Sequence, residues 1–153
     1  MKELISSGLE ALGLTGSVPP DAAEKLAEYG RLLLEKNQVM NLTAIRDEAG
    51  VARLHMLDCA ALLPCADLTG ARTLLDVGTG AGFPGLPLKI LLPQLDVTLL
   101  DSLNKRVDWL NEVSAQLGLT GVRAIQGRAE EKALEKSMRD SFDLVTARAV
   151  ADL

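Results

Sequence analysis

Cysteine, histidine and aromatic residues are scarce in this chain of 153 residues. Its two cysteines, Cys59 and Cys65, have a spacing that fits neither a set of metal ligands nor a disulfide framework. We therefore expect reduced thiols and no metal site. One tyrosine, one tryptophan and two phenylalanines are too few for a nucleic-acid platform on which several bases stack.

Long apolar runs and an excess of positive charge are also missing. No run approaches the roughly 20 residues of a membrane span, and the N-terminus lacks the apolar core of a signal peptide. A net charge of −5 argues against a domain that is basic overall, although a local basic face is compatible with it. The length suits one domain with a hydrophobic core. We expect a cytoplasmic protein without a membrane partner.

The pattern of apolar residues divides the chain into two segments. Residues 1–65 predict helices only, over 2–12, from a cap at Asp21, and over 48–63 with a stop before Pro64. After that, strands alternate with helices, which indicates βαβ units and a parallel sheet. The strands are expected at 73–77, 96–101, 122–126 and 142–146, and the helices at 84–92, 103–117 and 129–138. We therefore expect an N-terminal helical extension over 1–65 and an α/β, Rossmann-like domain over 66–153.

The end of the first strand and its following loop form the most informative segment. Asp76 stands two positions before Gly78, and Gly80 and Gly82 follow. Glycine takes positive φ readily and lets the backbone approach a ligand. The next helix begins beside the loop and presents free N–H groups at its N-terminus. The loop therefore predicts a nucleotide site, with a glycine-rich turn that binds nothing as the plainer alternative.

Two nucleotide cofactors fit this loop. Gly80-x-Gly82-x-x-Gly85, with Asp101 roughly 20 residues further on, matches the dinucleotide fingerprint of NAD-dependent oxidoreductases. The acid at Asp76 instead favours S-adenosylmethionine (SAM), because a carboxylate attracts its positive groups and would repel a pyrophosphate. We favour SAM and keep NAD as the alternative.

Charged residues follow the second and third strands, at the edge where parallel sheets bind ligands. Asp101 can accept hydrogen bonds from ribose hydroxyls, or it can cap the next helix. Glu130 can read an adenine edge, or it can simply lie in the first turn of a helix. Lys105 and Arg106 oppose the dipole of their helix, so they point either to a phosphate-bearing substrate or to solvent.

Two further residues invite a functional interpretation. Arg148 follows the fourth strand at the mouth of the predicted site, where a cation between alanines favours a functional role. His55 is the only histidine and shares a helix face with Asp58. We interpret this pair as a contact on the helix surface or between domains, in preference to a catalytic one.

Several stretches, in order from about residue 26 to the end, resemble the bacterial glucose-inhibited division protein B family. They are Asn41-Leu42-Thr43, His55-Met56-Leu57-Asp58, residues 75–85 with Phe83-Pro84, Leu99-Leu100-Asp101-Ser102, Lys105-Arg106 and Arg148-Ala149. The resemblance implies a class I SAM-dependent methyltransferase that modifies N7 of a guanine in 16S small-subunit ribosomal RNA. Its partner would be that RNA or a ribosomal particle.

The resemblance also implies which residues bind the cofactor and which orient the substrate. Cofactor contacts are expected at Gly78, Phe83, Ala129, Glu130 and Arg148, beside Gly80 and Asp101 from the loop pattern. Guanine N7 already presents a lone pair, so the reaction needs no general base. Arg148 stays protonated and is expected to orient the base or a phosphate.

The sheet of a class I methyltransferase has more strands than the four expected here. The resemblance therefore implies a sheet that is incomplete at the C-terminus. An open edge invites pairing with another chain, so we expect self-association through the fourth strand and little or no turnover. A truncated, non-catalytic SAM-binding domain is the corresponding alternative to an active enzyme.

Overall fold

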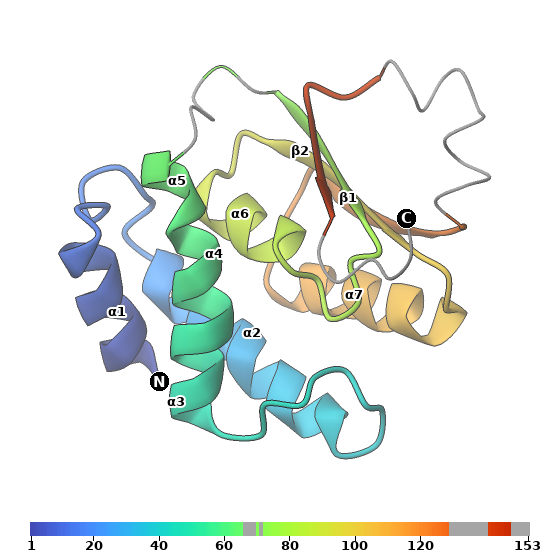
Figure 1. Cartoon of the computed structure of the whole chain (residues 1–153), viewed down its shortest axis with the longest axis horizontal. Helices are drawn as coiled ribbons and strands as arrows, with labels where there is room; N and C mark the ends of the chain where they lie inside the picture. The colour runs from blue at the N-terminus through green and yellow to red at the C-terminus, as the bar shows by residue number, and fades with distance from the viewer. Residues whose placement is uncertain (66–69, 71, 129–140, 148–153) are drawn as a thin grey trace.

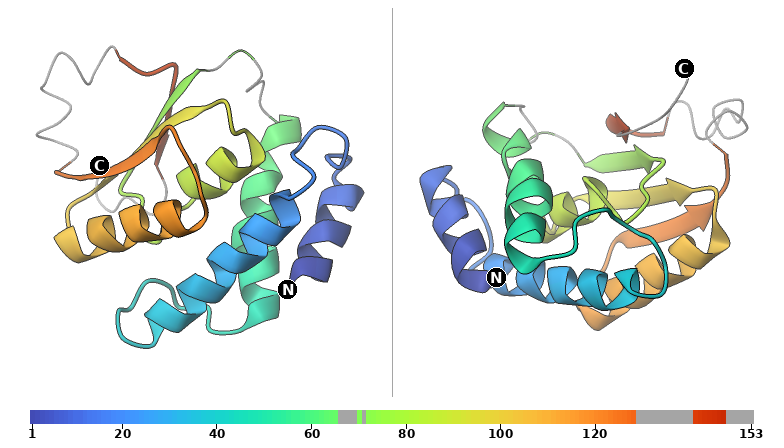
Figure 2. Two further views of the ribbon diagram at one scale, coloured as in Figure 1. Left: turned by 180° about the vertical axis from the view of Figure 1, so that it is seen from behind. Right: turned by 60° about the horizontal axis from the view of Figure 1, so that its bottom comes forward.

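A computed structural model describes residues 1–65, 70, 72–128 and 141–147 of the chain. These residues form a parallel sheet with helices packed on one side of it (Figure 1). Two helices, α6 (Gly85–Leu91) and α7 (Asn104–Gln116), lie directly against the sheet, and the N-terminal helices pack beyond them (Figure 2). This arrangement confirms the expected α/β fold class.

The four described strands are all parallel, in the order β3-β2-β1-β4. They are β1 (Thr73–Val77), β2 (Asp96–Asp101), β3 (Val122–Gln126) and β4 (Leu144–Ala147). The first three lie where the sequence predicts them. The fourth strand lies beside the first, and their carboxyl ends share one edge of the sheet.

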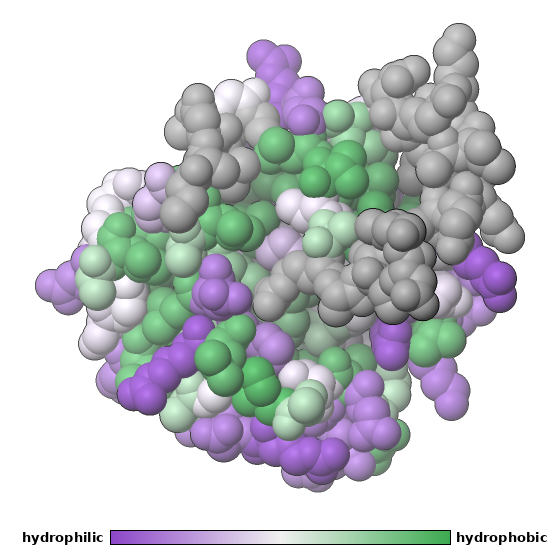
Figure 3. Space-filling view, in the orientation of Figure 1, coloured by the Kyte–Doolittle hydropathy of each residue, from purple (hydrophilic) through white to green (hydrophobic). Residues whose placement is uncertain are grey.

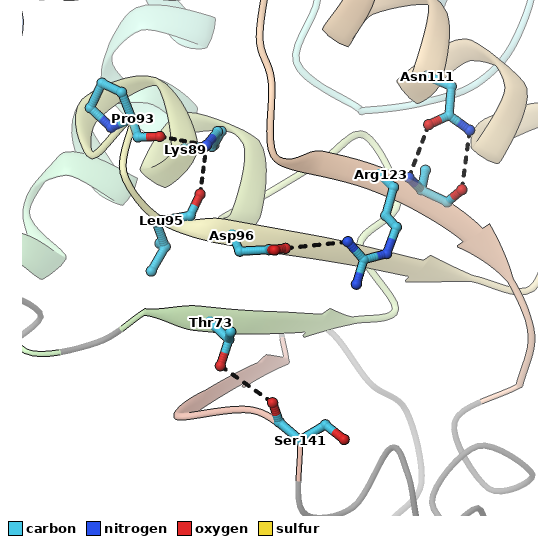
Figure 4. A network of polar contacts seen from close by, with 9 residues as sticks. Thr73, Lys89, Pro93, Leu95, Asp96, Asn111, Arg123 and Ser141 are labelled. Atoms are coloured by element: carbon cyan, nitrogen blue, oxygen red, sulfur yellow. Dashed lines mark hydrogen bonds and ion pairs between the residues drawn. The ribbon is translucent and has the colours of Figure 1, made fainter.

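The fourth strand begins two residues later than predicted. The Asp143 carboxylate accepts hydrogen bonds from the main-chain N–H groups of Arg72 (2.8 Å) and Thr73 (3.2 Å). The Thr73 hydroxyl donates to the Ser141 carbonyl (3.4 Å; Figure 4). The same hydroxyl accepts from the Asp143 N–H (2.9 Å). Side chains therefore satisfy the main chain here, and regular pairing with β1 starts only at Leu144.

The first two helices are α1 (Lys2–Ala11) and α2 (Ala22–Asn37). Asp21 stands at the N-cap of α2, but the prediction that its side chain caps the helix is wrong, since it makes no capping hydrogen bond. Its carboxylate instead lies 3.6 Å from the ammonium of Lys25, one turn along the helix.

The third expected helix is broken into pieces of different pitch. It consists of α3 (Glu48–Gly50), the π-helix η1 (Val51–Leu57), α4 (Asp58–Ala60) and α5 (Leu62–Cys65). The predicted stop before Pro64 is wrong, because Pro64 lies inside α5. Proline is tolerated in a first turn, where its missing N–H would have had no helical partner.

Helices α6 and α7 match their predicted positions to within one residue at each end. The amide of Asn111 on α7 bonds both main-chain groups of Ala124 on β3, at 3.0 and 3.1 Å.

Lys89 on α6 is buried, and its Nζ donates to the carbonyls of Pro93 and Leu95, each at 2.6 Å (Figure 4). Burial lowers the pKa of Lys89. The helix expected at 129–138 lies outside the described residues.

One hydrophobic cluster contains residues of the N-terminal helices, of α6 and α7, and of the sheet. Leu26 and Leu33 of α2, Met56 of η1, Leu86 of α6 and Leu99 of β2 are all fully buried in it. The N-terminal helices thus share a core with the helices that flank the sheet. In the described part of the chain, no helix has the length and apolar character needed to cross a membrane.

Candidate functional site

The loop after β1 joins the strand to α6 and carries three glycines with positive φ. The φ angles are 66° at Gly78, 59° at Gly80 and 105° at Gly82. This strand, loop and helix arrangement confirms the local structure expected from the sequence. The loop lies at the carboxyl edge of the sheet, where β2 also ends, at Asp101.

The glycines serve different purposes. A Cβ at Gly82 would lie 2.5 Å from the Tyr29 hydroxyl oxygen, and one at Gly85 would lie 2.5 Å from Leu99 Cδ2. Both glycines therefore allow close packing within the protein. A Cβ at Gly80 would meet nothing within 4 Å, so the open side of the loop lies there and leaves room for a ligand to approach the backbone.

Asp76 is fully buried and holds the loop from inside. Its Oδ2 accepts hydrogen bonds from the Thr79 hydroxyl (2.7 Å) and the Gly85 N–H (3.0 Å), and its Oδ1 accepts one from the Thr146 hydroxyl of β4 (3.1 Å). The expected attraction of this carboxylate for the positive groups of SAM stays a prediction, and its described hydrogen bonds are all within the protein. Asp76 thus ties the start of α6 and strand β4 to the loop.

Asp101 connects the loop to the helix that follows β2. One carboxylate oxygen accepts from the Gly80 N–H (2.9 Å), and the other accepts from the Leu103 N–H (3.0 Å). The Arg106 guanidinium lies 3.4 Å from that second oxygen, and Asp101 is 4% exposed. The alternative that Asp101 caps the helix is wrong, because Leu103 stands at the N-cap of α7 and no side chain makes a capping hydrogen bond there. The carboxylate instead joins Gly80, the open position of the glycine loop, to the residue just before α7.

Phe83 turns its ring toward the N-terminal helices. The ring is buried and stacks on His55, with centroids 4.2 Å apart and planes inclined by 10°. His55 Nε2 lies 2.7 Å from the Thr43 hydroxyl. His55 of η1 thus joins the N-terminal helices to the glycine loop through its contact with the buried ring of Phe83.

Sequence reasoning missed a contact between α2 and this loop. The hydroxyl of Tyr29 donates a hydrogen bond to the Ala81 carbonyl. The Tyr29 ring lies 5.5 Å from the ring of Phe83 and 6.4 Å from that of Trp109. The sequence offered one hint of this contact, the small number of aromatic residues: the chain has four, and three of them meet here.

Of the remaining predicted site residues, the structure describes Lys105 but not the three that follow β3 and β4. Lys105 is exposed and borders a cavity of about 330 Å³ together with Lys36, Met40 and Trp109. Ala129, Glu130 and Arg148 lie outside the described residues. The structure therefore brings together Gly78, Gly80 and Asp101 at one edge of the sheet, with Phe83 behind the loop.

Comparisons with known proteins give a consistent family assignment. The family model "GidB: rRNA small subunit methyltransferase G" matches residues 22–153. A protein of Alkaliphilus metalliredigens named "Ribosomal RNA small subunit methyltransferase G" is 46% identical over 152 residues, which cover 99% of this chain and 63% of that protein. A protein of the same name from Exiguobacterium sibiricum is 51% identical over 128 residues, covering 84% of this chain and 54% of that protein.

The chain spans less than two thirds of the length of each of these relatives. Among solved structures, a mutant of MtNAS in complex with S-adenosylmethionine superposes with a TM-score of 0.49 at 14% identity, over 99% of this chain and 73% of that one. A TM-score at that level is too low to establish a common fold.

Proposed function

Because the chain belongs to the GidB family of rRNA small subunit methyltransferases, we propose that it binds SAM and takes part in methylation of small-subunit ribosomal RNA at N7 of a guanine. Such a reaction belongs in the bacterial cytoplasm, where ribosomal subunits assemble. The family match carries this proposal, and the open side of the glycine loop at Gly80 supports it.

The described residues fit a nucleoside cofactor at the carboxyl edge of the sheet. Gly80 has room beside its Cα and a positive φ of 59°, so the backbone can lie against a ligand. Asp101 lies next to it, and a carboxylate oxygen that already accepts one N–H still has a lone pair for a ribose hydroxyl. In this proposal, Gly78, Gly80, the main chain of Phe83, and Asp101 hold the cofactor together with Ala129, Glu130 and Arg148.

When bound, SAM supplies an electrophilic methyl group on a sulfonium. Guanine N7 has an accessible lone pair, so the protein has no proton to remove before attack. Its task is to hold the methyl carbon in line with N7, and orientation of two reactants alone lowers a barrier by several kcal/mol. Arg148 is assigned to orienting the base or a phosphate, since a guanidinium cannot act as a base.

An NAD-dependent oxidoreductase finds no support in the comparisons, whose matches carry the name of an rRNA methyltransferase. A non-catalytic SAM-binding domain differs from the proposal only in turnover.

A methyl-transfer assay distinguishes the methyltransferase from these two alternatives. It measures transfer of a labelled methyl group from SAM to isolated small-subunit rRNA and to the small ribosomal particle. The chain of 153 residues is compared with a longer chain that carries the C-terminal portion of a relative. The proposal requires 7-methylguanine in RNA treated with the longer chain. Label at another atom, or no label with either chain, contradicts it.

A further inference from the structure

A side chain of the N-terminal helices reaches into the main chain of the glycine loop. Tyr29 lies in the middle of α2 and is fully buried. Its hydroxyl donates to the carbonyl of Ala81, which stands between Gly80 and Gly82. The two residues are 52 positions apart in the sequence, so this is a tertiary contact between the helical segment and the loop.

The loop is shaped to receive this hydroxyl. Gly82 takes a φ of 105°, and a Cβ at that position would lie 2.5 Å from the Tyr29 oxygen. The ring of Tyr29 lies against Phe83, and the Phe83 ring also stacks on His55. Residues 81 to 83 are therefore held on the helical side by one hydrogen bond and two ring contacts.

The sheet holds the other end of the loop. Asp101 accepts from the Gly80 N–H at 2.9 Å, and the Thr79 hydroxyl donates to Asp76 at 2.7 Å. Gly80, the position with open space beside it, thus lies between an anchor in the sheet and an anchor in α2. Burial raises the pKa of the Tyr29 phenol well above 10, so it remains a hydrogen-bond donor at neutral pH.

From this geometry we infer that Tyr29 is a positioning residue, which sets the backbone of residues 80–83 for cofactor binding through its hydrogen bond to Ala81. The N-terminal helices are then part of the cofactor site and not only a layer beside it. This inference rests on the proposed function for the identity of the cofactor, SAM. The effect of Tyr29 on the loop does not depend on it, because that effect is present in the protein without ligand.

The variant Tyr29→Phe tests this inference because it removes the hydroxyl and keeps the ring against Phe83. Ser114→Ala is the matched control, since the Ser114 hydroxyl is also buried and donates to a main-chain carbonyl, that of Leu110 at 2.8 Å. Both variants and the unaltered chain are compared by amide hydrogen exchange without ligand, and by calorimetric titration with SAM.

In Tyr29→Phe we expect exchange of the Gly80, Gly82 and Phe83 amides to rise about tenfold, and SAM to bind about tenfold more weakly, the scale of one lost hydrogen bond. Ser114→Ala should change neither quantity. General destabilisation would raise exchange along the whole core, whereas positioning confines the increase to the loop.

Equal loop exchange in the two variants would overturn the inference, and so would loop exchange that rises while SAM affinity stays unchanged. If the unaltered chain binds no SAM, the proposed function fails. Exchange in the ligand-free protein still decides whether Tyr29 sets the loop.

Discussion

Among single residues, the glycines of the loop decide whether a cofactor can lie against its backbone. Gly80 and Gly118 both have positive φ, 59° and 68°, and a Cβ at either would meet nothing within 4 Å. Only Gly80 lies in the loop beside Asp101. A side chain at either position therefore destabilises the fold to a similar extent, but only Gly80 is close to the proposed ligand.

We expect Gly80→Ala to abolish SAM binding while the fold survives. Both Gly80→Ala and Gly118→Ala place an L side chain in the left-handed region, at a cost of about 1–2 kcal/mol, so their melting temperatures should fall by similar amounts. Calorimetric titration with SAM should separate them. Loss of affinity in both variants, or in neither, would refute the role given to Gly80.

The variant Asp101→Asn should lower both stability and SAM affinity. Each carboxylate oxygen accepts one main-chain N–H, from Gly80 and from Leu103, and asparagine offers only one oxygen. One donor is left facing an NH₂ group, which costs roughly 1–3 kcal/mol. Thermal denaturation and SAM titration are measured together. A lower melting temperature with unchanged affinity would remove Asp101 from the cofactor site and leave it a purely structural role.

At the scale of secondary-structure elements, the start of β4 depends on one carboxylate. Two main-chain N–H groups, of Arg72 and Thr73, lower the pKa of Asp143 from its usual 3.8. A carboxyl whose pKa is depressed in the folded state stabilises the fold above its unfolded pKa. That stabilisation is lost as the pH falls through the folded pKa.

Asp143→Ala should therefore lower the melting temperature at neutral pH, and its difference from the unaltered chain should shrink as the solution is acidified below the usual carboxyl pKa. Asp108→Ala, at an exposed acid on α7, is the control. Melting curves across this pH range give the comparison. A deficit that persists unchanged into acid would show that the Asp143 hydrogen bonds do not depend on its charge.

The strands could be predicted well and the π-helix could not, for a physical reason. Residues 73–77 and 96–101 are short apolar runs that end at a loop glycine or an acid, so local sequence defines both their type and their limits. Nothing local marks the wider turn of η1 (Val51–Leu57). The site divides in the same way: the glycines and Asp101 follow from spacing, whereas the contacts of Tyr29 with Ala81 and of His55 with Phe83 arise only when α2 and η1 pack against the loop.

At the scale of the whole molecule, β4 forms one edge of the described sheet. Val145 on this strand is 61% exposed, and hydrophobic residues gather around the strand in the space-filling view (Figure 3). Main-chain groups on an open strand edge can pair with a second chain. We propose that this edge of the described sheet supports self-association.

We expect this chain to sediment as oligomers and Val145→Lys to shift it toward the monomer, because a charge on an edge strand opposes pairing. Val39→Lys adds the same charge at another exposed valine, 78% accessible and outside the sheet, and should have no such effect. Sedimentation velocity over a range of concentrations is the measurement. A monomer at every concentration, or equal effects of the two substitutions, would contradict association through β4.

We propose above all that the loop from Gly78 to Phe83 binds SAM and not a dinucleotide. Parallel calorimetric titrations of the unaltered chain with SAM and with NAD test it most directly, because both cofactors suit a glycine loop at the end of a parallel strand. We expect saturable binding of SAM at one site per chain and no binding heat from NAD. Saturable binding of NAD without binding of SAM would contradict the claim.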